Sequence, residues 1–373
     1  MRSIALFTGT RAEYGLMRSL IFNLINDDQF DFHLLVSASH FSDKFGNTIK
    51  EIEHDGINVF YKLPIELNNQ YELDMPYQTA DTIKVVSKIL IKIDPDYLIV
   101  LGDRYETFAA AAAAHLLGIK IVHIHGGETT LGALDDKLRN AITQLSSIHF
   151  TSAEVHKQKV QNMLISKNNI FNIGPLVIDG LLNLEIISKK IFEEKTGFIF
   201  KENNFLITYH SETVTDDLGI SGLENLLEVL SKTKCNLLFT SPNADKGSDI
   251  IIDKIQNFVK NNKNKCFYIP SLGQELYLNA LILFDCIIGN SSSGINEAPL
   301  LKKNVINLGI RQKGRYRFGS VLDVKNDLKS ISNAIYKISQ IPKDNPFDIK
   351  EFKKSYISKS PSNQIIKFLK SIV

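Results

Sequence analysis

Short apolar runs alternate with helix-like stretches along almost the whole chain, and this alternation restricts the fold more than any other feature of the sequence. In the first half, the runs that we expect to form strands lie at 3–8, 32–37, 97–101, 119–124, 148–151 and 170–173. Between them, residues 13–25 repeat leucine every four positions and residues 107–117 are rich in alanine, as helices are. Such alternation predicts parallel sheets with helices on both faces.

The second half repeats the pattern and predicts a second domain. Its expected strands lie at 205–209, 236–240, 266–269, 284–288 and 304–308. A chain of 373 residues is too long for one ordinary core. We therefore expect an α/β protein with two Rossmann-like domains, at 1–175 and 176–345. Terminal helices at 346–373 follow, and packing back on the first domain is one arrangement open to them.

Composition narrows the class of protein. The net charge of +2 gives no reason to expect nucleic acid or an anionic membrane as a partner. Cys235, Cys266 and Cys286 are widely spaced and form no CxxC pair, so we expect buried thiols in a reducing compartment. The N-terminus does not resemble a signal peptide, and no apolar run is long enough to span a membrane. A cytoplasmic protein is the expectation.

Polar motifs follow seven of the expected strands. They are Gly9-Thr10-Arg11, Gly102-Asp103-Arg104, His125 to Glu128, Tyr209 to Glu212, Ser241 to Asp245, Gly289 to Gly294 and Gly309 to Arg315. In open parallel sheets, ligands bind at the carboxyl ends of the strands. Two such sheets that face each other would place all seven motifs around one cleft between the domains.

The run from His123 to Glu128 combines two histidines, two glycines and a carboxylate after a buried strand. This mixture is typical of a site for proton transfer on a small ligand, and the alternative is a glycine turn beside a structural histidine. Alternation would place His123 and His125 on one face of the strand. Gly-Gly-Glu is not a familiar zinc spacing, however, so we expect no metal.

The candidate acid and base residues are Asp103, His125, Glu128, Asp135 and His210. Each has a structural alternative. Asp103 could form an ion pair with its neighbour Arg104, and Asp135 with Asp136 could only start a helix. His210 ends a buried strand, where a lone histidine is more often structural.

The loop at 289–294 and the basic turn at 309–315 are candidates for phosphate binding. The loop, which contains Ser291, Ser292 and Ser293, is expected to open a helix, whose free N–H groups attract phosphate. Helix capping is the alternative role for these serines. Glu297 follows one turn later and could accept both hydroxyls of a ribose.

Arginines near these loops suit a diphosphate. Arg311 and Arg315 lie in the basic turn, and Arg11 could reach the same phosphates from the first domain. The alternative is a solvated basic turn. The first turn, Gly-Thr-Arg, is not GxGxxG, which argues against a nicotinamide cofactor.

Five motifs together resemble the hydrolysing UDP-N-acetylglucosamine 2-epimerases of bacterial sialic acid biosynthesis, the NeuC family. They are TGTRAEYG (8–15), LGDRYE (101–106), HIHGGE (123–128), GNSSSG (289–294) and RQKGR (311–315). The resemblance implies a fold of the GT-B type and release of UDP and N-acetylmannosamine from UDP-N-acetylglucosamine. It also implies a homodimer that needs neither metal nor nicotinamide.

The resemblance also implies roles for single residues. Asp103 and Asp135 match two catalytic acids, Glu128 belongs to the Gly-Gly-Glu motif, and His210 matches a histidine near the phosphates. His125 stands where many relatives carry glutamate, so the base at C2 of the sugar is His125 or Glu128. The nucleotide side is matched by Arg11 and the serines for the diphosphate, Glu297 for ribose, Arg311 for phosphate or sugar, and Asn243 and Asp245 in a Pro-Asn-x-Asp motif.

Three alternatives stay open, one of them a non-catalytic protein that only binds a nucleotide sugar. Near relatives in the family act on UDP-N,N′-diacetylbacillosamine, and the sequence does not reveal the pocket for the sugar's C4 and C6 substituents. A GT-B glycosyltransferase would share the phosphate-binding loops but add a site for an acceptor.

Overall fold

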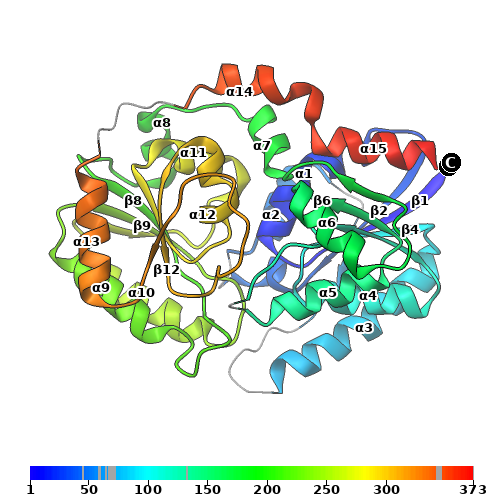
Figure 1. Cartoon of the computed structure of the whole chain (residues 1–373), viewed down its shortest axis with the longest axis horizontal. Coiled ribbons are helices and arrows are strands. Elements are labelled where there is room, and N and C mark those ends of the chain that lie inside the picture. Colours follow the sequence, from blue (N-terminus) through cyan, green and yellow to red (C-terminus); the bar gives the residue numbers. More distant parts are fainter. Residues whose placement is uncertain are drawn as a thin grey trace. The chain divides into compact units, whose positions relative to one another are not determined.

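The computed structural model describes residues 1–43, 46–57, 60–63, 65, 73–131, 133–341 and 347–372. The chain forms two compact units, and Figure 1 labels many of their helices and strands. The first unit contains Met1–Glu128, Asp135–Asn183 and Lys350–Val373. The second unit contains Thr129–Leu134 and Leu184–Ile349.

The described residues of the first unit contain a seven-stranded parallel sheet in the order β3-β2-β1-β4-β5-β6-β7. Its strands are β1 (Arg2–Thr8), β2 (Phe30–Ser37), β3 (Phe60–Leu63), β4 (Tyr97–Leu101), β5 (Lys120–Ile124), β6 (Ile148–Thr151) and β7 (Ile170–Asn172). Its main helices are α1 (Arg11–Ile25), α2 (Ile49–His54), α3 (Asp74–Ile93), α4 (Tyr105–Leu116), α5 (Asp135–Leu145) and α6 (Glu154–Met163). The strand order reverses between β1 and β4, which is the switch point where such sheets bind ligands.

Strand β1 is buried on both faces because helices cover each side of the sheet. Ile4 and Leu6 lie in one apolar cluster with residues of α1 and α15 (Pro361–Ser371). Ala5 and Phe7 point the other way, into a cluster with residues of α3 and α4. A continuous apolar run, rather than an alternating one, is what this double burial requires.

The second unit repeats the architecture, with six parallel strands among its described residues in the order β10-β9-β8-β11-β12-β13. The strands are β8 (Asn204–Thr208), β9 (Asn236–Thr240), β10 (Cys266–Tyr268), β11 (Cys286–Gly289), β12 (Asn304–Leu308) and β13 (Leu322–Val324). The helices include α8 (Lys189–Thr196), α9 (Ile220–Lys232), α10 (Ser248–Asn261), α11 (Gly273–Leu283), α12 (Ser293–Asn296) and α13 (Leu328–Ser339). Here the switch point lies between β8 and β11.

The two parallel sheets confirm the predicted Rossmann-like fold class, with differences at particular strands. Strands β3 and β13 were not expected, because each is short and contains a charged residue, Lys62 or Asp323. Both lie at a sheet edge, where a strand needs less apolar surface. Strand β11 begins at Cys286 rather than at Phe284, whose ring packs against Phe198 instead.

The compact units divide the chain at places other than the expected domain borders. Helix α7 (Val177–Asn183) packs against α1, so the first unit continues to Asn183 rather than ending at residue 175. The expected border between 345 and 346 falls on residues outside the described part of the chain. Helix α15, drawn in red in Figure 1, packs against α1 and α7 of the first unit.

Asp179 of α7 binds the start of α15. Its Oδ1 accepts the Ser360 hydroxyl (2.6 Å), and its Oδ2 accepts the backbone N–H of Ser362 (2.8 Å) and the Ser362 hydroxyl. Asp179 is buried, and burial raises the pKa of its carboxyl although all three hydrogen bonds oppose the shift. A carboxylate also interacts favourably with a helix N-terminus.

In the described residues, no helix combines the length and apolar character that crossing a membrane requires.

We expect Asp179→Ala to lower the free energy of unfolding by about 2–3 kcal/mol, because it leaves buried donors at the start of α15 without an acceptor. Urea unfolding followed by circular dichroism measures this loss. The exposed Asp81 on α3 supplies the control, since Asp81→Asn removes a carboxylate from the surface and should shift stability by less than about 0.5 kcal/mol. Equal stability of the two variants would contradict the role of Asp179.

Candidate functional site

The seven polar motifs lie at or just beyond the carboxyl ends of β1, β4, β5, β8, β9, β11 and β12. Within the first sheet, Arg11 and Asp103 follow the strands on either side of the switch point. Within the second sheet, His210 and Ser291 do the same. Each unit therefore has a cluster of candidate residues at the position where its type of sheet binds ligands.

Asp103 pairs with Arg139 of α5 and not with its neighbour Arg104, the partner that the structural alternative supposed. The side chain of Arg139 is 1% exposed, and its Nη1 also donates to the Glu128 carbonyl (3.0 Å). Burial alone would lower the pKa of Arg139, but nearby carboxylates raise it, namely those of Asp103, Glu128, Asp135 and Asp136. Arg139 thus brings together acidic residues from the ends of β4 and β5 and the start of α5.

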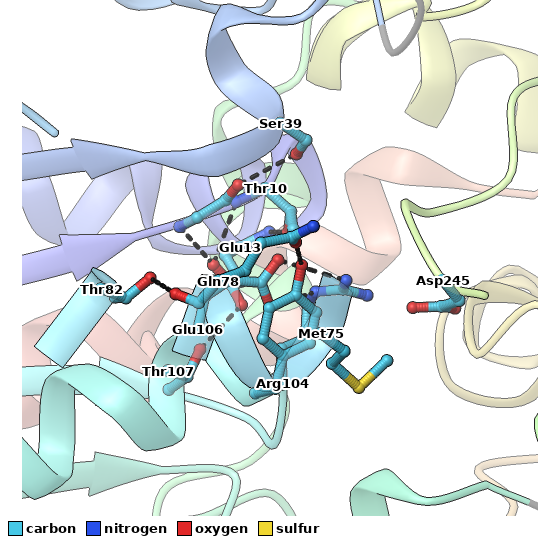
Figure 2. Close-up of polar contacts among 12 residues, drawn as sticks. Thr10, Glu13, Ser39, Met75, Gln78, Thr82, Arg104, Glu106, Thr107 and Asp245 are labelled. Atoms are coloured by element: carbon cyan, nitrogen blue, oxygen red, sulfur yellow. Dashed lines mark hydrogen bonds and ion pairs between the residues drawn. The ribbon is translucent and has the colours of Figure 1, made fainter. Parts of the chain in front are cut away.

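Arg104 instead forms a buried ion pair with Glu106, with 3.2 Å between Nε and Oε2. Beside this pair lies Glu13 of α1, whose Oε2 accepts the backbone N–H groups of Gly9 (2.7 Å) and Thr10 (3.1 Å). Figure 2 shows these side chains together. Burial, followed by the charge of Glu106, raises the pKa of Glu13 to about 7.

His123 has a structural role. Its Nε2 lies 2.8 Å from the Gly102 carbonyl, which can only accept, so the ring hydrogen is on Nε2. Its Nδ1 lies 3.2 Å from the Thr143 hydroxyl. Burial lowers the pKa of His123 to about 3, so the ring is neutral and holds the turn before Asp103.

His125 lies beyond the end of β5 and has a left-handed backbone with φ +62°. The expectation that it shares a strand face with His123 is therefore wrong. Its Nε2 accepts the backbone N–H of Leu176 (3.3 Å), which places the ring hydrogen on Nδ1, 3.5 Å from Glu128 Oε1. A left-handed conformation costs a residue other than glycine about 1 kcal/mol or more, and such strain is common at functional sites.

Glu128 is buried, and its Oε1 also accepts the Ser152 hydroxyl (2.7 Å). Because a hydroxyl has one hydrogen, the Ser152 oxygen accepts from His156 Nδ1 (2.9 Å). Gly127, with φ +78°, is required by packing, since a Cβ there would overlap the His156 carbonyl. The glycine turn and the polar cluster are thus parts of one arrangement rather than alternatives.

His210 is held by Asn290 at the switch point of the second sheet. The side chain of Asn290 accepts the His210 backbone N–H (2.6 Å) and donates to the His210 carbonyl (2.8 Å). The backbone N–H of Asn243 donates to Nδ1 of His210 (3.0 Å), which places the ring hydrogen on Nε2. His210 is therefore oriented as a neutral donor with a fixed tautomer.

Arg311 and Gln312 are buried beside the same asparagine rather than solvated. Arg311 Nη1 and Gln312 Nε2 both donate to the Asn290 carbonyl, at 3.3 and 2.7 Å. Arg311 also pairs with Asp245 (3.6 Å), so Asp245 braces this loop. The carboxylate of Glu212 accepts the backbone N–H of Arg311 (3.3 Å) and fixes the start of the basic turn.

The serine loop opens α12, which is only four residues long. The loop does open a helix, as expected, but a helix of one turn contributes little of the dipole that attracts phosphate. Ser292 makes no side-chain cap, Ser291 accepts the backbone N–H of Ser293 (3.3 Å), and the Ser293 hydroxyl accepts from Tyr277 (2.7 Å). Hydroxyls and short-loop amides, rather than a helix dipole, are the groups available here.

Glu297 follows α12 with its Oε2 buried and without a hydrogen-bond partner among the described residues. Burial raises the pKa of this carboxyl, while a hydrogen bond from Ser293 and the charge of Arg315 lower it. A buried acceptor without a donor costs free energy that a ligand hydroxyl would recover. Gln312 Oε1, in the basic turn, is another buried acceptor of this kind among the described residues.

Sequence reasoning missed Arg139, Glu13, Glu106, Ser152, Asn290 and Gln312 as parts of the two clusters. Arg139 left a signal, because α5 places it four residues before Thr143 on a buried face beside Ile142. A charged residue at such a position needs buried partners.

Asp135 and Asp136 both lie in the first turn of α5. Asp135 therefore also starts a helix, which is the structural role that we gave as its alternative. Within the described ranges, no group of three His, Cys, Asp or Glu side chains is arranged to hold a metal.

Comparisons with known proteins give a consistent family. The model of the family described as UDP-N-acetylglucosamine 2-epimerase matches residues 23–370. The polysialic acid biosynthesis protein P7 of Escherichia coli is 37% identical over 350 residues, 93% of this chain and 88% of that protein. The GDP/UDP-N,N′-diacetylbacillosamine 2-epimerase (hydrolyzing) of Campylobacter jejuni is 35% identical over 329 residues, 88% of this chain and 85% of that protein.

The fold has a solved counterpart. The UDP-GlcNAc 2-epimerase of Methanocaldococcus jannaschii, solved in complex with UDP-GlcNAc and UDP, superposes with a TM-score of 0.78. The match covers 99% of both chains at 20% identity. The fold is therefore that of two Rossmann-like domains of the GT-B type.

We expect the Glu13 carboxyl to make stability depend on pH. Its pKa in the folded state, about 7, lies above the ordinary value of 4.5, so the folded chain binds one more proton than the unfolded chain between these limits. Stability from this group is therefore present below about pH 4.5 and is lost as the pH rises to 7. From pH 4.5 to 8, Glu13→Gln should gain about 3 kcal/mol relative to the parent chain. Urea unfolding of both at several pH values measures this gain, and parallel profiles would contradict it.

Proposed function

Because this chain belongs to the UDP-N-acetylglucosamine 2-epimerase family, we propose that it is a hydrolysing epimerase. It converts UDP-N-acetylglucosamine and water into UDP and N-acetylmannosamine. The observation that carries the proposal is the convergence of Asp103, Glu128 and Asp135 on the buried guanidinium of Arg139. Acidic groups from the ends of β4 and β5 and from the start of α5 are gathered there, at the edge of a sheet where ligands bind.

The reaction needs two proton transfers at C2 of the sugar. In the first step a base removes the C2 hydrogen while UDP leaves from C1 on the opposite face, giving 2-acetamidoglucal. Water then adds its oxygen to C1, and an acid returns a proton to C2 from the other side. Each well-placed acid or base contributes roughly 10²–10⁴-fold to such a step.

We assign the acid and base roles to the first unit. Asp103 and Asp135 are the acids, and Arg139 fixes the carboxylate of Asp103 through a direct ion pair. His125 and Glu128 face each other across 3.5 Å and act as a pair in C2 chemistry. His210 of the second unit, with its hydrogen on Nε2, donates to the leaving diphosphate.

We assign the nucleotide to the second unit, with Arg11 of the first unit as a further phosphate contact. The buried acceptor of Glu297 supports a role in binding the ribose hydroxyls. Ser291, Ser292 and Ser293 supply hydroxyls for the diphosphate. Arg315 lies close enough to Glu297 for its charge to lower the pKa of that carboxyl. The contacts of Arg311 with Asn290 and Asp245 support a role in shaping this loop as well as in binding phosphate, and Asn243 supports His210.

The proposal includes a homodimer in the cytoplasm that uses no metal or nicotinamide. The homodimer rests on the likeness of the five motifs to the hydrolysing epimerases, and the cytoplasm on the reducing compartment that the three cysteines suggest.

The test of the reaction uses UDP-N-acetylglucosamine as the only substrate in D₂O. We expect one UDP for each N-acetylmannosamine, and deuterium at C2 of the sugar, because the C2 proton exchanges with solvent during catalysis. Nuclear magnetic resonance of the products measures both. Return of UDP-N-acetylmannosamine would indicate the non-hydrolysing reaction, and absence of turnover without an acceptor would point to a glycosyltransferase. Parallel assays with UDP-N,N′-diacetylbacillosamine test the preferred sugar.

We expect Asp103→Asn to lower kcat by roughly 10²–10⁴-fold while UDP affinity stays within about threefold, because the residue acts on the sugar and not on the nucleotide. UDP release assays and titration calorimetry measure the two quantities. The matched control is Asp253→Asn on the exposed surface of α10, which should retain full activity. An unchanged kcat in Asp103→Asn would remove Asp103 from the proposed mechanism.

A further inference from the structure

Glu13 joins two turns that carry different parts of the proposed site. It belongs to α1 and follows Arg11 by two residues, yet its carboxylate points back to the turn after β1 and across to α4, as Figure 2 shows. None of the proposed catalytic or binding roles uses it. Glu13 is a buried carboxylate at the switch point of its sheet, and it accepts hydrogen bonds from two backbone N–H groups and one hydroxyl. Because burying a charge is costly, these contacts suggest a specific role for this residue.

On one side, Glu13 holds the turn that precedes Arg11. Its Oε2 accepts the backbone N–H groups of Gly9 and Thr10, and Thr10 accepts the N–H of Glu13 in return (3.3 Å). From the 3₁₀ helix η1 (Ala38–Phe41), the N–H and hydroxyl of Ser39 donate to the Gly9 carbonyl at 3.1 and 2.9 Å. Hydrogen bonds to both the N–H and the carbonyl of Gly9 therefore fix the path of the chain into Arg11.

On the other side, Glu13 holds the helix that follows Asp103. Its Oε1 accepts the Thr107 hydroxyl of α4 (3.1 Å). Tyr105, also in α4, donates to Gln78 of α3 (2.6 Å), so the start of α4 is fixed from a second direction. One carboxylate thus connects the turn with the proposed phosphate contact to the helix next to the proposed catalytic acid.

We propose that Glu13 is a positioning residue for the diphosphate of the substrate: by tying the Gly9–Thr10 turn to α4, its carboxylate sets the place of Arg11 relative to Asp103. This inference rests on the proposed function for its substrate. It predicts that loss of the negative charge on Glu13 weakens substrate binding and leaves the chemical step largely unchanged.

The groups around Glu13 place its titration near neutral pH. From the start of α4 it faces Glu106, whose charge raises its pKa, and Arg104 and Thr107, which lower it. From the turn it meets backbone N–H groups, and the nearby His40 of η1 is neutral because burial lowers its pKa to about 3. Protonation of Glu13 weakens its two bonds to the turn, since charge-assisted hydrogen bonds are about twice as strong as neutral ones.

The experiment measures KM and kcat for UDP-N-acetylglucosamine between pH 6 and 8.5. In the parent chain we expect KM to rise as the pH falls through about 7. Glu13→Gln should remove this rise and hold KM across the range at roughly ten times the parent's value at pH 8.5, with kcat changed less than about threefold. Glu53→Gln, an exposed glutamate of α2 in the same unit, is the matched control and should keep the parent profile.

Two further variants separate positioning from a general loss of structure. Thr107→Val removes a hydrogen bond that lowers the pKa of Glu13, so the rise in KM should move to higher pH. Glu106→Gln removes a neighbouring charge that raises this pKa, so the rise should move to lower pH. The proposal would be overturned if the rise in KM moved in the same direction in both variants. It would also be overturned if the KM of Glu13→Gln at pH 8.5 lay within twofold of the parent's.

Calorimetry with UDP keeps the inference separate from the proposed function. Titration of the UDP phosphate affects every variant alike, so the informative quantity is the ratio of Kd values for Glu13→Gln and the parent at pH 8. A ratio of about ten or more supports the role of Glu13 even if the chain fails to turn over UDP-N-acetylglucosamine. A ratio near one overturns it even if turnover is normal.

Discussion

A buried polar side chain at each switch point is the interaction on which both clusters depend. Where neighbouring strands of a parallel sheet send their chains to opposite faces, the turns beyond them expose backbone groups that the sheet no longer pairs. In the first unit Glu13 accepts two of these N–H groups and a hydroxyl from α4. In the second unit the amide of Asn290 pairs with both backbone groups of His210. The same problem is solved with a carboxylate in one sheet and an amide in the other.

The choice between a carboxylate and an amide has electrostatic consequences. Asn290 is neutral at every pH, so the two hydrogen bonds between its side chain and the backbone of His210 do not depend on a proton. Glu13 lies beside the Arg104–Glu106 pair, where a second buried negative charge is costly and its pKa rises to about 7. Buried charges such as Arg139 seldom add stability over apolar residues of similar size, but they require one specific arrangement of their partners. The first unit thus uses its polar core to define positions for acidic groups.

The sequence was sufficient for the parts of the fold that depend on local pattern. The apolar runs at β1 and β4 predicted buried strands because both faces of those strands are covered. The edge strands β3 and β13 were not predicted, because Lys62 and Asp323 interrupt their short apolar runs. The partners of buried charges could not be predicted, because they depend on distant packing. Asp103 has an arginine beside it in sequence but pairs with Arg139, which is 36 residues away. The serine loop was recognised from its composition, but the shortness of α12 depends on how the chain turns after Glu297.

The return of α15 to the first unit affects the order in which this protein can be completed on the ribosome. The helix contributes Ile365 and Leu369 to the apolar cluster around β1, although α1 and β1 are synthesised long before it. The first unit must therefore wait, with part of that cluster uncovered, until the whole second unit has left the exit tunnel. During this interval the exposed face of α1 is a place where a chaperone could bind, and premature termination would leave an incomplete core however well the second unit had folded.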